Sequence, residues 1–393
     1  MSGCIAVINA GSSSIKFATY DAAPGEQLLF HGKIDGIGAS PKLEASDADG
    51  RAVAAHSWLA LDHAAATGEI LEVARELIGA RQVVAVGHRV VHGGTRFDKP
   101  ARVDADVIAA LKQLIPLAPL HQPHNIAPIE AIAAAAPHIP QVACFDTAFH
   151  HGQPPLAQMF GLPREYADAG VRRYGFHGLS YEYVSGRLAE IAPALSAGRV
   201  VIAHLGNGAS LCALRGGRSQ ATTMGFTALD GLVMGTRSGA LDPGVLIHLM
   251  DAFGMGARDI EDLLYRRSGL LGVSGVSSDM RTLRASTEPA AAAAIALFVY
   301  RVIREIGSMA AALGGIDGLV FTGGIGENDA ATRAEIAAGC AWLGLDLDRA
   351  RNSGGGPLIS RQGSKLAAWV VPTDEERVIA RHARDTLALT PAG

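Results

Sequence analysis

The sequence predicts an α/β protein made of two related halves. A strand, a tight Gly/Ser/Asn loop and a second strand are expected at residues 4–20, and again at residues 199–214. Apolar runs then alternate with helical patterns in both halves, which favours sheets covered by helices. The length of 393 residues exceeds one ordinary core and favours about two domains. Similar loops in the two halves therefore indicate a duplicated domain.

The first half continues after its hairpin with helices and strands in alternation. The expected elements are a helix over 67–78, a strand over 82–87, a helix over 105–114, an Ala-rich helix and a strand over 141–145. Gly79 ends the first of these helices, because glycine readily adopts the backbone conformation that stops a helix. Pro116 and Pro119 separate the next two helices with a polar turn.

The second half repeats this arrangement. The expected elements after its hairpin are a polar loop over 229–243, helix starts near Asp242 and Ala257, a helix over 289–313, a strand over 318–322, a strand over 367–371 and a final helix over 375–387. Pro289 suits the first turn of the long helix, and Gly314 and Gly315 end it. The glycines at 354–356 indicate a surface turn.

Composition excludes several classes of protein. Hydrophobic residues make up 49% and charged residues 18%, which is typical of a globular chain. The net charge is −4 and no basic tract occurs, so nucleic acid is not an expected partner. The longest apolar run, 290–300, is far shorter than the ~20 residues that span a membrane. We expect no signal peptide, and four dispersed cysteines in mostly apolar runs indicate reduced thiols of a cytoplasmic protein.

Polar side chains stand where predicted strands end. They are Asn9, Arg89, Asp146, His204 and Thr322. Ligands of open α/β sheets bind at the carboxyl ends of strands, so these residues are candidates for one site. The small polar loops of the two hairpins expose backbone N–H groups that can hold phosphate oxygens.

Familiar catalytic motifs are missing from the sequence. There is no Walker A motif, no Gly-x-Gly-x-x-Gly after a strand, no Gly-x-Ser-x-Gly and no His-Glu-x-x-His. Six histidines could suggest a metallohydrolase: His88, His92, His121, His124, His150 and His151. However, residues 90–91 and 93–94 favour a strand and a turn there, so a His-ligated metal is not expected. Phosphate binding must use a different loop chemistry.

Eight segments, in order along the chain, resemble the signatures of the acetate kinase family. They are residues 8–16, 86–94, 145–150, 173–178, 204–208, 234–239, 275–279 and 321–328. The likeness extends from residue 5 to about residue 380. It implies duplicated ribonuclease H-like domains of the actin and sugar-kinase type with a cleft between them, a homodimer, ATP/ADP as substrate, and a divalent metal, usually Mg²⁺ with Mn²⁺ as the alternative.

The resemblance also implies how the domains divide the work. Domain I would comprise residues 1–147 and the C-terminal helix 376–393, and would carry the acyl substrate and the metal. Domain II would comprise residues 148–375 and would bind the nucleotide. The implied reaction moves the γ-phosphoryl of ATP to acetate, whose pKa of about 4 leaves it ionised at neutral pH. A strong general base is then unnecessary, and cations that neutralise repulsion matter most.

By the same resemblance, the catalytic residues are Asp146, Arg89, His177 and Arg237. Arg89 would bind the acetate carboxylate and the transferring phosphoryl, and Arg237 and His177 would stabilise its equatorial oxygens. Asp146 matches the family's acid/base, although an ionised acceptor favours a metal-positioning role. His121 would either help to place the phosphoryl or pack in the Pro-rich turn.

Asn9 and Glu375 match the family's metal-site positions. The alternative for Glu375 is a helix-dipole partner, which is how we interpret Glu376. The expected nucleotide contacts come from four segments: Ser12, Ser14 and Lys16; His204, Leu205, Gly206, Asn207 and Gly208; Asp279, Met280 and Arg281; and Gly324, Ile325, Gly326, Glu327 and Asn328. Lys16 is either such a contact or a solvated strand lysine.

The chain departs from the family's pattern at a few positions. The acyl pocket would comprise Val91, Leu120, Phe176 and Ala228, where Ala228 replaces a proline and should admit some propionate. Tyr181 stands where a histidine is common, and Gln122 and Met280 replace an asparagine and a phenylalanine. We therefore expect an acetate kinase. The alternatives are a propionate kinase of the same family and a non-catalytic nucleotide-binding relative.

Overall fold

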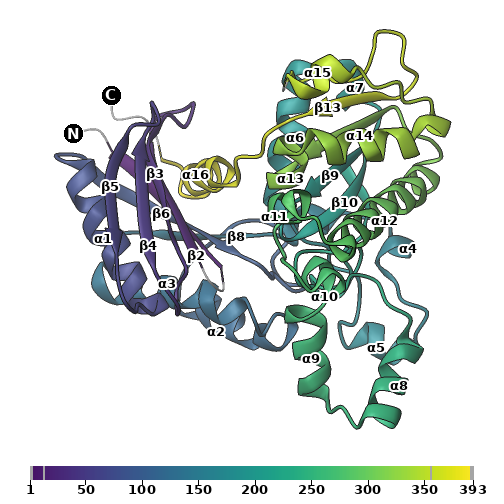
Figure 1. The fold of residues 1–393 in the computed structure, drawn as a ribbon. Helices are drawn as coiled ribbons and strands as arrows, with labels where there is room; N and C mark the ends of the chain where they lie inside the picture. Colours follow the sequence, from purple (N-terminus) through teal and green to yellow (C-terminus); the bar gives the residue numbers. More distant parts are fainter. Residues whose placement is uncertain (1–2, 12–13, 355, 390–393) are drawn as a thin grey trace. The chain divides into compact units, whose positions relative to one another are not determined.

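The computed structural model describes residues 3–11, 14–354 and 356–389. The chain forms two compact units (Figure 1). Unit 1 comprises Met1–Phe149 and Asp374–Gly393, and unit 2 comprises His150–Thr373. The glycine turn expected at 354–356 includes residue 355, which lies outside the described residues.

Unit 1 is built on an eight-stranded sheet with the order β5-β4-β3-β2-β1-β6-β8-β7. Its strands are β1 Gly3–Ala10, β2 Ser14–Asp21, β3 Leu28–Asp35, β4 Lys42–Asp47, β5 Ala52–Ser57, β6 Gln82–Val90, β7 Ala101–Arg102 and β8 Gln141–Phe145. Strands β1 to β5 form antiparallel pairs in sequence, whereas β1, β6 and β8 run parallel.

Helices cover both faces of the unit 1 sheet (Figure 1). They are α1 His63–Ile78, α2 Ala105–Gln113, η1 Ile115–Leu117, α3 Gln122–Ala135 and α16 Glu375–Thr386. On one face, Ile8 and Phe17 of the sheet share a buried cluster with Ile70 of α1. On the other face, α16 lies so close to β6 that a Cβ added at Gly87 would come within 2.5 Å of Ile379 Cγ2.

Unit 2 is built on a five-stranded sheet with the order β11-β10-β9-β12-β13. Its strands are β9 Arg199–Leu205, β10 Ala209–Arg215, β11 Arg218–Thr222, β12 Gly318–Thr322 and β13 Ala367–Val370. Strands β9, β10 and β11 pair antiparallel, and β9, β12 and β13 run parallel. The same directions and order occur in unit 1 for β3-β2-β1-β6-β8. This shared topology confirms the predicted duplication.

The helices of unit 2 are more numerous. They are α4 Pro155–Gln158, α5 Arg164–Asp168, α6 Gly178–Ile191, α7 Pro193–Ser196, α8 Pro243–Phe253, α9 Ala257–Arg266, α10 Gly269–Ser274, α11 Met280–Ala285, α12 Pro289–Leu313, α13 Gly323–Asn328, α14 Ala330–Gly339, η3 Ala341–Leu343 and α15 Arg349–Ser353. The long α12 contacts β10 and β11, and α6 and α7 contact β9.

Aspartate begins many of these helices. The N-cap side chains that accept backbone N–H groups are Asp62, Asp104, Asp242, Asp279, Asp329, Asp348 and Asp374. Such a carboxylate satisfies an N–H that has no partner within the helix, a contribution of about 1 kcal/mol each. The caps show why short helices such as α11 and α15 begin where they do.

Two parts of unit 1 differ from the sequence-based prediction. Strands β3, β4 and β5 were not anticipated. Because β5 is almost wholly exposed, its sequence needs no alternation of apolar and polar residues, which is the signal that would have predicted a strand. Helix α3 begins at Gln122, inside the segment expected to be a turn, because Pro123 is compatible with the first turn of a helix. Among the described residues, no helix is long and apolar enough to cross a membrane.

Candidate active site

Strand pairing brings the polar strand ends of unit 1 onto one face of its sheet. Gly87 faces α16, and Arg89 lies two residues further along β6, so both point to the same face. Val7 of β1 is the parallel partner of Gly87, which places Asn9 on that face as well. The first turn of α16, with Glu375 and Glu376, lies over this face.

The side chains meet in a cluster around Arg89. Its Nε and Nη2 donate to Oδ1 and Oδ2 of Asp146 at 3.1 and 2.6 Å, a bidentate ion pair. Its Nη1 donates to Asn9 Oδ1 at 3.3 Å. Asn9 Nδ2 in turn donates to Glu376 Oε1 at 2.9 Å and to Glu375 Oε2 at 3.4 Å. Four residues predicted for the site thus lie together, and Glu376 joins them in addition to its place at the helix start.

Burial determines the electrostatics of this cluster. Asp146 is 1% exposed, and burial raises the pKa of its carboxyl above the ordinary value, although the Arg89 guanidinium opposes the rise. Burial disfavours the charged form of Arg89, but the Asp146 and Glu375 carboxylates together raise the pKa of its guanidinium. Three carboxylates therefore surround one cation, and this excess of negative charge suits a further cation.

The donor set fits a magnesium-type ion. Carboxylate and amide oxygens are the protein ligands that Mg²⁺ prefers, and it takes its other ligands from water and phosphate. Among the described residues, no three His, Cys, Asp or Glu side chains are grouped to hold a metal. An ion at this cluster would consequently need Asn9 as well as Glu375 or Glu376.

Buried amides hold the segments that carry the predicted acyl-pocket residues of unit 1. Val91 is 3% exposed, and its N–H donates to Asn125 Oδ1 at 2.9 Å. Asn125 Nδ2 donates to the carbonyl of Ala10 at 2.6 Å, at the end of β1. Gln122 pairs with the backbone of His92 at 3.3 and 3.1 Å, and Leu120 precedes it in the turn before α3. His121 is the N-cap residue of α3.

The loop between β1 and β2 is anchored at its described ends. Gly11 N donates to the Ser14 carbonyl at 2.8 Å, and His63 Nε2 bonds to the Gly11 carbonyl at 2.9 Å. Ser12 lies outside the described residues. Lys16 is exposed and is the cross-strand partner of Asn9, so it lies on the face of the sheet that carries the Arg89 cluster.

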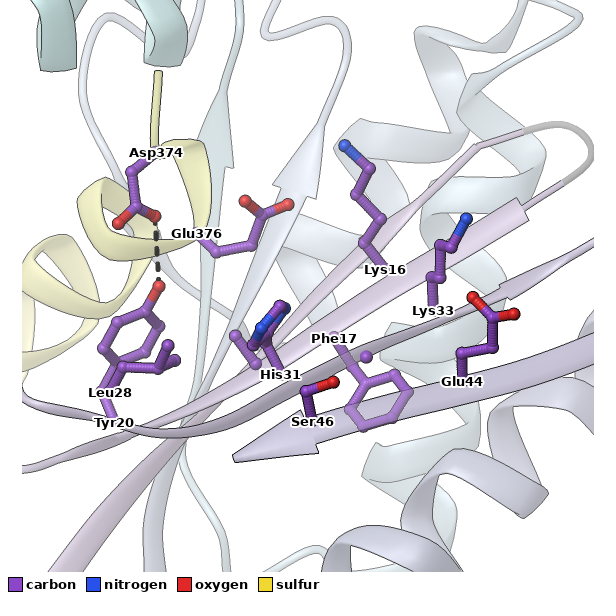
Figure 2. A pocket seen from close by; sticks show the side chains of 12 residues that line it. Lys16, Phe17, Tyr20, Leu28, His31, Lys33, Glu44, Ser46, Asp374 and Glu376 are labelled. Carbon is purple, nitrogen blue, oxygen red and sulfur yellow. Dashed lines mark hydrogen bonds between the residues drawn. The ribbon is translucent and has the colours of Figure 1, made fainter. Parts of the chain in front are cut away.

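A hollow of about 420 Å³ opens on this face of the sheet in unit 1 (Figure 2). Its wall includes Lys16, Lys33 and Glu44, which are successive cross-strand partners, and Glu376 of α16. Figure 2 also shows Tyr20 donating to Asp374 at its rim, at 3.1 Å. The hollow is thus adjacent to the Asn9–Glu376 contact.

In unit 2 two histidines lie side by side. The rings of His177 and His204 stack with centroids 4.2 Å apart and an angle of 21°. Ser210 Oγ bonds to His177 Nδ1, and Ser180 Oγ bonds to His204 Nδ1, both at 2.8 Å. His177 has a φ of 58°, a left-handed conformation that is rare for residues other than glycine.

The Gly loop after β9 faces these groups. A Cβ added at Gly208 would lie 3.2 Å from His177 Nε2 and 3.3 Å from Arg237 Nη2. Arg237 Nη1 donates to the Ala228 carbonyl at 2.7 Å, which brings this acyl-pocket candidate beside it. Phe176 is 2% exposed, and its carbonyl bonds to His150 Nε2 at 2.9 Å. Unit 2 therefore brings together His177, His204, Arg237 and the loop.

A larger cavity of about 910 Å³ opens nearby in unit 2. Its wall contains eight of the predicted nucleotide-binding residues: Gly206, Asn207, Asp279, Met280, Arg281, Gly324, Ile325 and Asn328. Ser278, Arg284, Ala285 and Asp329 also line it, and the sequence did not single them out. Hydrogen bonds from Arg281 and from the backbone of α11 lower the pKa of Asp279 and keep it anionic.

Some predicted nucleotide contacts stand apart from this wall. His204, Leu205, Gly208, Gly326 and Glu327 do not line the cavity in the described part of unit 2. Glu327 Oε1 accepts the N–H groups of Gly323 at 2.8 Å and Thr373 at 3.0 Å. Its carboxylate thus joins the segments that follow β12 and β13, which indicates a structural role.

Other residues of the site were missed because they carry no motif. Asn125 and Ser210 form hydrogen bonds to residues 34 and 33 positions away. Arg284 reaches the cavity from α11 and pairs with Asp329 and Glu335. Only the three-residue spacing of Arg281 and Arg284 on one helix could have indicated a shared wall.

The family of the chain follows from comparison with known proteins. The model of the acetokinase family matches residues 4–381, and the chain belongs to this family. An acetate kinase of Rhodopseudomonas palustris is 54% identical over 390 residues, covering 97% of this chain and 98% of that protein. An acetate kinase of Nitrobacter hamburgensis is 50% identical over 383 residues, covering 96% and 95%. The predicted family is thus confirmed, and the chain is a kinase.

Solved structures agree with this family. The acetate kinase of Porphyromonas gingivalis superimposes with a TM-score of 0.87 at 39% identity, covering 98% of this chain and 100% of that one. A propionate kinase of Francisella tularensis gives a TM-score of 0.91 at 36% identity, covering 98% and 99%. These likenesses confirm the predicted fold class. They include kinases named for two different acids.

Proposed function

We propose that this chain is an acetate kinase that transfers the γ-phosphoryl of ATP to acetate and runs in both directions. The carboxylate oxygen of acetate attacks the γ-phosphorus, the bond to the ADP oxygen breaks, and acetyl phosphate and ADP leave. The observation that carries the proposal is the Arg89 guanidinium, held between Asp146 and Asn9 at the ends of three strands. The family membership supports the reaction.

Arg89 has the properties that such a reaction needs. Two anions must approach each other, and a cation held rigidly beside both lowers their repulsion. The bidentate pair with Asp146 fixes the plane of the guanidinium, while Nη1 faces Asn9. Asp146 would then serve to orient Arg89 and to support the metal. Proton removal is not needed, because the acceptor carboxylate is already ionised.

His177 and Arg237 are proposed to stabilise the phosphoryl group in transfer. Both present nitrogen atoms to the bare α-carbon of Gly208, where phosphate oxygens could approach the loop without a side chain in the way. An arginine in this role is worth about 10³-fold or more in rate. The cavity of about 910 Å³ is proposed to hold the adenosine, with Gly324 at the start of α13 near the phosphates.

Asn9, Glu375 and Glu376 are proposed to hold the divalent ion, which we take to be Mg²⁺, with Mn²⁺ as the alternative. Such an ion would neutralise charge on the phosphate chain when bound. Its protein ligands would be oxygen atoms that meet in the described cluster.

The acid preference is proposed to be acetate over propionate. Val91 keeps a branched side chain in the predicted pocket, whereas Ala228 offers less bulk than a proline. One methylene is worth only ~1–3 kcal/mol of discrimination, so some turnover of propionate is expected. The likeness to a propionate kinase structure makes this the natural second candidate.

The assembly is proposed to be a homodimer in the cytoplasm. Helix α8 has no buried residue among its eleven, all of which are described, and Ile247 and Phe253 are 60% and 69% exposed. A second copy that covers this apolar helix would remove that surface from water. The four cysteines are buried thiols, which suits a reducing compartment. Light scattering of wild type and Ile247→Glu would test the dimer: a monomeric wild type would contradict it.

The reaction is tested by forming acyl hydroxamates from ATP and hydroxylamine with acetate, propionate and butyrate in parallel. We expect the highest kcat/KM with acetate. A higher value with propionate would favour the second candidate. No product from any acid, with folded protein and bound ATP, would instead indicate a non-catalytic nucleotide-binding protein.

A further inference from the structure

Two side chains of unit 2, Tyr181 and Ser210, form a continuous hydrogen-bonded chain with His177. The hydroxyl of Tyr181 lies 2.5 Å from Ser210 Oγ, and Ser210 Oγ lies 2.8 Å from His177 Nδ1. Tyr181 and Ser210 are both 0% exposed. Tyr181 stands one helical turn after His177 in α6, and Ser210 comes from the neighbouring strand β10. Two elements thus support one ring.

The chemistry of the three groups gives the chain a direction. Burial raises the pKa of Tyr181 well above its ordinary value, so this phenol keeps its proton and has it to donate. A serine hydroxyl has one hydrogen and can accept two bonds. If Ser210 accepts from Tyr181, its own hydrogen is directed to His177 Nδ1. A neutral imidazole that accepts at Nδ1 carries its hydrogen at Nε2.

The Nε2 atom of His177 is the one that faces the Gly loop. A Cβ added at Gly208 would approach it to 3.2 Å, and Arg237 Nη2 lies at a similar distance from the same point. The stacked His204 ring and the left-handed backbone of His177 hold the imidazole in this orientation. A hydrogen at Nε2 would therefore point to the space beside Gly208, whereas the other tautomer would present a lone pair to an anion there.

We propose that Tyr181, acting through Ser210, holds His177 as the neutral tautomer with its hydrogen on Nε2, so that His177 donates to a phosphate oxygen. Tyr181 is then a positioning residue for phosphoryl transfer. This inference rests on the proposed function for its consequence in catalysis. The tautomer itself is a property of the protein without substrate.

The first experiment measures the tautomer and the kinetics of Tyr181→Phe. The ring ¹⁵N shifts of His177, assigned by comparison with His177→Gln, should show an unprotonated Nδ1 and a protonated Nε2 in the wild type. Tyr181→Phe should give a mixture of tautomers and lower kcat on the order of 10-fold, with the KM for ATP nearly unchanged.

Tyr174→Phe is the matched control. Its hydroxyl donates to the Gly170 carbonyl at 2.8 Å, it is 8% exposed, and it lies outside the chain of three groups. It should change neither quantity.

The second experiment tests the route through the serine. Ser210→Ala should lower kcat as well, and adding Tyr181→Phe to it should have no further effect, because the tyrosine would have nothing left to act on. A wild-type His177 with its hydrogen on Nδ1 would overturn the proposal. So would an unchanged ¹⁵N pattern in Tyr181→Phe, or additive losses in the double variant. Absence of kinase activity in the wild type, with the expected tautomer present, would instead contradict the proposed function.

Discussion

Replacing Arg89 by alanine is the most direct test of the buried ion pair in unit 1. The pair joins Arg89 to both carboxylate oxygens of Asp146, and the side chains are 18% and 2% exposed. Removing the guanidinium leaves the Asp146 carboxylate buried beside Glu375. The negative charge of Glu375 and the burial both raise the pKa of Asp146, and no cation then opposes the rise. The variant must therefore either keep an uncompensated buried charge or take up a proton.

The magnitude follows from this burial. Breaking a buried pair by removing one partner costs about 3–5 kcal/mol, since the remaining charge is poorly solvated. We expect Arg89→Ala to lose this much free energy of unfolding at pH 8. The loss should shrink toward pH 5, because a protonated Asp146 carries no charge. In Arg89→Ala/Asp146→Asn the loss should be about 2–3 kcal/mol smaller than the sum of the single losses. Turnover should fall by about 10³-fold in Arg89→Ala.

Urea unfolding measures the free energies, and hydrogen-exchange mass spectrometry of the β6 and β8 segments separates unit 1 from unit 2. The matched control is the pair of Arg199 and Asp317 in unit 2, which is also bidentate, at 3.0 and 2.7 Å. Its side chains are 36% and 40% exposed, so Arg199→Ala should show a much smaller coupling that salt weakens further. Kinase activity should be unaffected in this control.

Three results would contradict the reasoning. If the coupling free energy of Arg89 and Asp146 were no larger than that of Arg199 and Asp317, burial would not determine the strength of these ion pairs. A loss of stability in Arg89→Ala that grows as the pH falls would contradict the uncompensated carboxylate. Wild-type turnover in a folded Arg89→Ala would remove the proposed role in catalysis.

Three further predictions concern pH, the loop and the metal. Burial lowers the pKa of His88, His92 and His150 to about 4 in the folded protein. As the pH falls below 6.5, these histidines therefore take up protons in the unfolded chain before they do so in the folded one. Stability should fall from pH 6.5 to 4 by up to about 3 kcal/mol per histidine, and unfolding curves that stay flat would contradict this. Gly235→Ala should raise the KM for ATP, because the new Cβ would lie 1.8 Å from Asn207 Oδ1 and displace that side chain. An unchanged KM would show that Asn207 does not contact the nucleotide. EDTA should abolish activity, and added Mg²⁺ should restore it, whereas full activity in EDTA would exclude the proposed ion.

Local signals in the sequence predicted many of the elements. Pro289 and Gly314 mark the ends of α12, and the apolar run over 318–322 became β12 within the expected limits. Both predictions depend on backbone preferences of single residues, which act over a few positions. Strands β3, β4 and β5 were missed. Only β5 is an edge strand, and none of its residues is buried. Strands β3 and β4 each bury two apolar residues, Phe30 and Ile34 and then Leu43 and Ala45, between polar residues that mask the pattern.

The candidate site was predicted less completely than the fold. Asn9, Arg89, Asp146 and Glu375 were selected from their positions at strand ends and from the family likeness, and the structure places them within one cluster. Glu376 was interpreted as a helix-dipole partner only. Its contact with Asn9 joins residues 367 positions apart, and no local pattern could indicate which carboxylate of α16 would reach that amide.

By itself, the sequence determined the two halves, the loops that end their first strands, and the chemical types available at the strand ends. These follow from the alternation of apolar and polar residues and from glycine and proline, which act locally. Only the tertiary structure decided which groups meet: Arg89 with Asp146, Asn9 with both glutamates, and Tyr181 with His177 through Ser210. Such contacts depend on strand register and on the face that each side chain occupies, and both are set by packing between segments far apart in the chain.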